Sequence, residues 1–142
     1  MYRDPDMELI EMQLERGYTP KVDGYADEET RSELLNPNDI VIEDEQIHIE
    51  FRYPLATPVM FTHSKKGGFT RLDIFRLIYE GYKYIYEQEE KEVGDPGTYE
   101  RSYNRQKSTG KYGIWGHYIS DLWIEFVYYK PAEKTIYLRI GS

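Results

Sequence analysis

Three histidines and one aspartate are the residues of this chain best suited to acid–base or metal chemistry: His48, His63, His117 and Asp121. An imidazole titrates near neutral pH and binds zinc, and a carboxylate beside it can orient the ring. His63 and His117 fall in or near expected loops, so they can meet over the start of a helix and form, with Asp121, a candidate catalytic set. The alternative, which the residue types favour, is that the histidines are separate and bind no metal.

A second candidate is the loop of residues 62–68, which joins an expected strand to the start of a helix. It contains Lys65, Lys66, Gly67 and Gly68. Free amides at a helix N-terminus, together with two lysines and two glycines, are what a small bound anion requires. The spacing is not that of a Walker A loop. We therefore expect an anion-binding loop, with the alternative that the glycines only permit a turn and the lysines are solvated.

The third candidate is an aromatic surface that follows the glycine-rich stretch 110–117. Tyrosine and tryptophan combine a large apolar area with a polar group, which favours protein interfaces and sugar stacking. Trp123 alternates with core-facing neighbours, so either the N-terminal segment or a partner must cover it. The residues expected to bind a partner are Tyr112, Trp115, Tyr118 and Trp123.

No complete catalytic motif accompanies these candidates. The chain has no cysteine, which excludes thiol nucleophiles and thiolate zinc sites. None of its serines lies in a G-x-S-x-G elbow. We therefore expect a non-enzymatic protein-binding or assembly module that needs no cofactor and has a protein partner or a second copy of itself. An anion-binding or hydrolase-like domain that uses the basic loop and His117 is the alternative.

The charge pattern narrows the classes of partner. The net charge is −8, but residues 1–50 hold 4 basic against 15 acidic residues, whereas residues 51–142 hold 14 against 11. This acidity argues against nucleic-acid binding. The longest apolar runs are too short to span a membrane, and no apolar leader opens the chain, so we expect a cytoplasmic protein.

The elements that must position these residues are clearest around a long helix. Thr70 and Asp73 form a capping box, the apolar stripe continues through Ile85, and Gly94 marks the end, so the pattern predicts a helix over 71–93. Gly81 lies beside the stripe, where it would allow a close approach to a sheet. The acidic last turns predict that the basic residues of the next loop fold over them. Those residues are Arg101, Arg105, Lys107 and Lys111.

Alternating apolar residues predict four strands around this helix. Two are expected at 46–53 and 59–63, with Pro54 and Pro58 placing the second at a sheet edge. Two more form a hairpin at 122–129 and 136–140. Two short helices are expected before residue 36. We thus predict an α+β fold, in β-β-α-β-β order, with an acidic helical segment at 1–38 and a core domain at 39–142 that form one compact unit.

Two segments also resemble known families. The pattern Leu14-x-x-Gly17-Tyr18, Val22-Asp23-Gly24 and Glu29-Thr30-Arg31 resembles the first two helices of the peptidoglycan-binding domain family, over residues 5–35. That resemblance implies cell-wall binding through the N-terminal helices, although the family's third helix has no counterpart here. Residues 112–122 and the C-terminal Gly141-Ser142 are similar to small proteins of plants and large DNA viruses, which implies no function.

Overall fold

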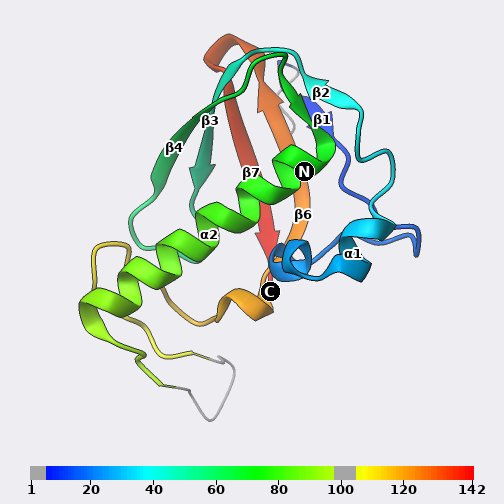
Figure 1. Cartoon of the computed structure of the whole chain (residues 1–142). Coiled ribbons are helices and arrows are strands. Elements are labelled where there is room, and N and C mark those ends of the chain that lie inside the picture. Colours follow the sequence, from blue (N-terminus) through cyan, green and yellow to red (C-terminus); the bar gives the residue numbers. More distant parts are fainter. Residues whose placement is uncertain (1–5, 98–104) are drawn as a thin grey trace.

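A computed structural model describes residues 6–97 and 105–142 of the chain. Its main sheet has five strands in the order β1-β6-β7-β3-β4, and one long helix, α2, lies diagonally across one face (Figure 1). The strands are β1 Glu8–Ile10, β3 Gln46–Phe51, β4 Val59–Ser64, β6 Trp123–Lys130 and β7 Thr135–Gly141. A separate pair consists of β2 Ile40–Ile42 and β5 Phe69–Thr70. The α+β class and the helix across the sheet are therefore as expected.

Helix α2 extends over Arg71–Val93, as the sequence predicts. The capping box is present, since the Thr70 side chain accepts a hydrogen bond from the Asp73 amide and the Asp73 side chain accepts one from the Thr70 amide. Gly81 faces Phe51 of β3 so closely that a Cβ atom there would lie 2.2 Å from the ring. The expected close approach of helix to sheet is thus confirmed, and it sets how deeply α2 lies on β3.

The order of the strands differs from the expected one. The β6–β7 hairpin is antiparallel, and so is the β3–β4 hairpin, but β3 joins the two by pairing parallel with β7. The expectation of an all-antiparallel, four-stranded sheet is therefore wrong in strand count and in this central pairing. β4 does lie at the edge, where the two prolines place it.

The expected pair of N-terminal helices is not seen in the described residues. Residues of the first form strand β1, which pairs with β6, and the second is reduced to the six-residue helix α1, Glu28–Glu33, after the short 3-10 turn η1, Val22–Ala26. The buried positions Ile10, Met12 and Leu14 alternate, which is the period of an extended chain. An extended segment must find its backbone hydrogen bonds outside itself, and the free edge of β6 supplies them to β1.

Candidate functional site

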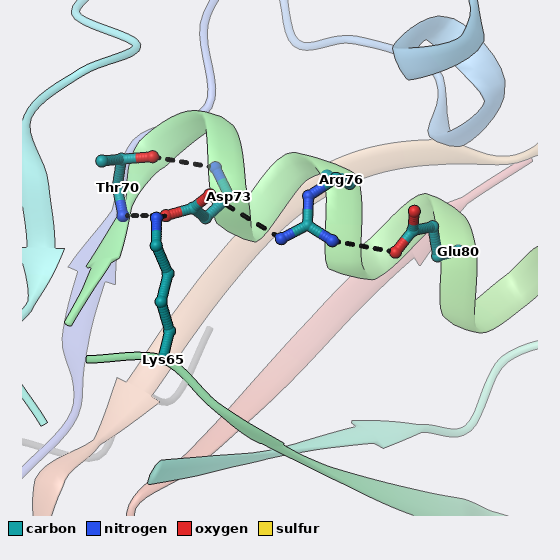
Figure 2. Close-up of polar contacts among 5 residues, drawn as sticks. All are labelled: Lys65, Thr70, Asp73, Arg76 and Glu80. Carbon is teal, nitrogen blue, oxygen red and sulfur yellow. Dashed lines mark hydrogen bonds and ion pairs between the residues drawn. The ribbon is translucent and has the colours of Figure 1, made fainter. Parts of the chain in front are cut away.

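The basic loop at the start of α2 is bonded to the chain's own carboxylates. Lys65 forms an ion pair with Asp73, which also accepts from the Thr70 amide and lies 3.7 Å from Arg76 (Figure 2). Burial would raise the pKa of Asp73, but the bonds from Lys65 and Thr70 outweigh it and lower that pKa. Lys65 and the amides of Thr70 and Asp73 are thus already paired inside the molecule.

The two glycines of this loop have clear backbone roles. Both have positive φ, 87° at Gly67 and 91° at Gly68, a region that favours glycine. The Gly67 amide donates to the Glu45 carboxylate over 2.6 Å, and a Cβ on Gly68 would lie 2.3 Å from the Ile42 carbonyl oxygen. Lys66 is exposed. Anion binding by Lys65, Lys66, Gly67 and Gly68 stays a prediction, and these contacts give it little support.

The three histidines lie apart. His48 faces Thr62 across the β3–β4 ladder, with 2.7 Å between its Nδ1 and the hydroxyl, on the sheet face opposite α2. His63 pairs with Ile47 near the start of β3 and faces α2. His117 lies near the other end of β3, where its ring is 5.9 Å from that of Tyr53. In the described residues no group of three or more histidine, aspartate or glutamate side chains is arranged to hold a metal.

His117 and Asp121 belong to a structured turn. The Tyr118 amide donates to the Asp121 carboxylate at 2.9 Å, while the His117 Nδ1 lies 3.9 Å from the same group. Tyr86 of α2 donates its hydroxyl proton to the His117 carbonyl. These contacts fix the turn against α2, but they leave His117 far from His63, so the catalytic set of His63, His117 and Asp121 is not brought together.

The expected aromatic surface is divided among separate environments. Tyr112 is only 4% exposed and belongs to the core. Trp115 packs edge-on against Tyr53, and Tyr118 donates its hydroxyl proton to Asp95. The N-terminal segment covers part of Trp123, since Tyr18 packs against its edge and the Lys21 Nζ lies 5.3 Å from the ring centre.

Sequence reasoning missed a buried carboxylate at the end of α2. Glu89 is fully buried and accepts hydrogen bonds from the amides of Tyr112 and Gly113 at 3.0 and 3.1 Å, as well as from the Ser108 hydroxyl. The loop after α2 thus folds back on the acidic helix end, as expected. The contacts with Glu89 come from backbone amides and the Ser108 hydroxyl, however, and not from the expected basic side chains. Arg105 is buried there between the rings of Tyr86 and Tyr118, whereas Arg101 lies outside the described residues.

The free side of β4 is a second feature that lies outside the expected site residues. The Lys65 amide bonds to the Glu45 carbonyl, and the His48 amide bonds away from β4 to the Lys134 carbonyl. Since the direction of backbone groups alternates along a strand, odd-numbered residues of β4 bond to β3, and the N–H and C=O groups of Met60, Thr62 and Ser64 point outward. We call these outward groups the β4 edge.

A hollow of about 350 Å³ lies between this edge and the helix. We call it the β4–α2 hollow. Its lining residues are Phe61, Thr62, His63, Glu80, Gly81 and Tyr84. Tyr84 is 50% exposed, and its ring packs edge-on against Phe61. The buried Nε2 of His63 has no hydrogen-bond partner in the described part of the chain, and burial, with the nearby Arg76, lowers the pKa of His63, which favours the neutral ring.

Comparisons with family models, curated proteins and solved structures found no match for this chain. Among the described residues, no helix is both long and apolar enough to cross a membrane.

Proposed function

We propose that this protein is a non-enzymatic binding module that takes up an extended segment of a protein partner along the β4 edge. The observation that carries the proposal is a six-residue edge strand that pairs on one side only within the described residues and lies beside an apolar hollow. A strand added there gains main-chain hydrogen bonds from the edge, while alternate side chains enter the β4–α2 hollow.

The composition of β4 supports this use. Proteins normally protect an edge strand with charged residues, an internal proline or a bulge. β4 reads Val-Met-Phe-Thr-His-Ser, has neither lysine nor glutamate, and keeps an unbroken register with β3. Met60 is 46% exposed on it. An edge of this kind is suited to pairing. By contrast, β1 at the opposite edge has only three residues.

The other hypotheses have less support from the geometry. A hydrolase-like site needs the basic loop and His117 together, yet they lie near opposite ends of β3. Cell-wall binding through N-terminal helices loses its premise, because the first helix is replaced by strand β1. A protein partner remains our proposal, but its contact surface moves from Trp115 and Trp123 to the β4 edge.

A display library of random peptides tests strand addition directly. We expect selection to yield apolar peptides that bind the wild-type protein and lose at least about tenfold in affinity on Thr62→Pro, because proline removes an outward N–H and leaves the β3 ladder intact. Thr62→Val is the matched control, since it keeps the N–H and loses only the hydroxyl. Failure to enrich any peptide, or equal binding by the proline variant, would refute strand addition.

A further inference from the structure

The outward groups of β4 restrict how any strand can pair with it. Met60, Thr62 and Ser64 each offer an N–H and a C=O, whereas Pro58, the next outward position before them, has no N–H. A partner therefore gains most from pairing over residues 60–64. The outward row ends at Ser64, since β4 ends there and the chain turns over residues 65–68.

The β4 strand of a second copy can pair over residues 60–64. Two antiparallel copies of β4 related by a two-fold axis can be centred on Thr62, so that Thr62 pairs with its own counterpart and Met60 with the second copy's Ser64. All three outward residues of each copy are then hydrogen-bonded. Centring on Phe61 would leave Ser64 opposite Pro58, and centring on His63 would leave Met60 opposite Lys66 in the turn.

The side chains are also compatible with this register. Phe61 of one copy lies opposite His63 of the other on the face toward α2, and aromatic pairs of this kind stabilise a sheet. On the other face, the two Thr62 side chains meet at the axis, and cross-strand threonine pairs are favourable. The axis is perpendicular to the sheet, so both α2 helices lie on the same side, and the exposed Tyr84 and the hollow of each copy face the junction.

The distribution of charge permits this contact in spite of a net charge of −8 on each copy. The strongly acidic residues 1–50 include β1, at the sheet edge opposite β4, but also nearly all of β3, which lies beside β4. Residues 51–142, which contain β4, have more basic than acidic residues. β4 itself has no aspartate, glutamate, lysine or arginine, so the two paired strands would bring no like formal charges opposite each other.

We infer that the occupant of the β4 edge is a second copy of this chain, which forms a two-fold dimer through antiparallel β4 strands centred on Thr62. The inference rests on the proposed strand addition and specifies its partner. The contact is confined to one strand from each copy and the side chains beside it, so the dimer is expected to be weak and to depend on concentration.

Single cysteines test the register, because the chain has no cysteine of its own. Paired residues of an antiparallel ladder have Cα atoms about 5.5 Å apart, within the range of a disulfide. Thr62→Cys should therefore form a disulfide dimer under mild oxidation. Met60→Cys alone should not, since the Cα atoms of position 60 in the two copies would be about 14 Å apart. Met60→Cys mixed with Ser64→Cys should give the mixed dimer.

Sedimentation velocity over a range of concentrations provides the second measurement. We expect reversible dimers of the wild-type protein and of Thr62→Val, and at least about tenfold weaker association of Thr62→Pro. A strictly monomeric wild-type protein without a Thr62→Cys disulfide would overturn the second copy as occupant. Peptides selected by display would then still bind in a manner sensitive to Thr62→Pro if strand addition is correct, so the two proposals fail separately. A disulfide between Met60→Cys and Thr62→Cys chains would refute the register.

Discussion

Among the acidic residues that the structure describes, Glu89 is the one that is fully buried. Burial by itself would raise its pKa, but hydrogen bonds from the Ser108 hydroxyl and from the amides of Tyr112, Ile114 and Gly110 outweigh that effect and lower it. We predict that Glu89→Gln lowers the free energy of unfolding by about 2–3 kcal/mol at pH 7, because its amide NH₂ would face N–H donors. Urea denaturation measures this loss.

The pH dependence of that loss identifies the charge as its cause. Since the pKa of Glu89 is lower in the folded than in the unfolded chain, its stabilisation is complete above the ordinary value of 4.5 and is lost as the pH falls toward the folded pKa. The difference between wild type and Glu89→Gln should therefore shrink below pH 4.5. Glu90→Gln, at an exposed neighbour, is the control and should change little. A loss that does not vary with pH would show that the carboxylate charge is irrelevant.

The contact between α2 and β3 depends on one glycine. In an isolated helix Gly81→Ala would stabilise by about 1 kcal/mol. In this fold the added Cβ would lie 2.2 Å from the Phe51 ring, and overpacking of a core costs about 1–3 kcal/mol. We predict a net loss of about 1–2 kcal/mol in the free energy of unfolding, measured by chemical denaturation.

A double-mutant cycle separates packing from helix propensity. Phe51→Leu removes the ring that opposes residue 81, so Gly81→Ala should cost less on that background than in the wild type. Stabilisation by Gly81→Ala in the wild-type protein would contradict the close approach. Equal costs on both backgrounds would locate the strain elsewhere.

The helices and strands that could be predicted are those specified by nearby residues. The capping box and Gly94 define α2, and alternation defines the β6–β7 hairpin, because these signals act within a few residues. β1 and the parallel β3–β7 pairing were missed, since they depend on which distant strand has a free edge. The alternating burial of Ile10, Met12 and Leu14 was a usable signal for β1.

The candidate site was harder to predict than the fold. The prolines indicated that β4 lies at an edge, but which of its backbone groups are free follows only from its register with β3. Glu89 could not be distinguished from the solvated glutamates around it, because its partners are amides more than 20 residues further along the chain. His63 and His117 were proposed as catalytic residues because imidazoles suit acid–base chemistry. Their separation could not be predicted, because it depends on how the strands are arranged in the sheet.

Hydrogen bonds join the N-terminal segment to the sheet and to α2. The Ile124 amide donates to the Pro20 carbonyl and the Val22 amide to the Leu122 carbonyl, each at 3.0 Å, while Arg71 of α2 donates to the Glu11 carbonyl. We predict one cooperative unfolding transition for the full chain, followed by calorimetry and by circular dichroism. A chain of residues 39–142 should not reach the native fold, because it lacks β1 and the apolar residues that precede α1.

A chain of residues 6–142 is the control for that truncation, since it retains every described contact. It should unfold within a few degrees of the full chain. In the 39–142 chain, strand β6 loses β1, and the apolar surface that Ile10, Met12, Leu14 and Val22 cover becomes exposed. A 39–142 chain that unfolds cooperatively with native near-ultraviolet dichroism would show that residues 1–38 are dispensable. The acidic segment would then be an appendage, and the charge of the core alone would govern self-association at the β4 edge.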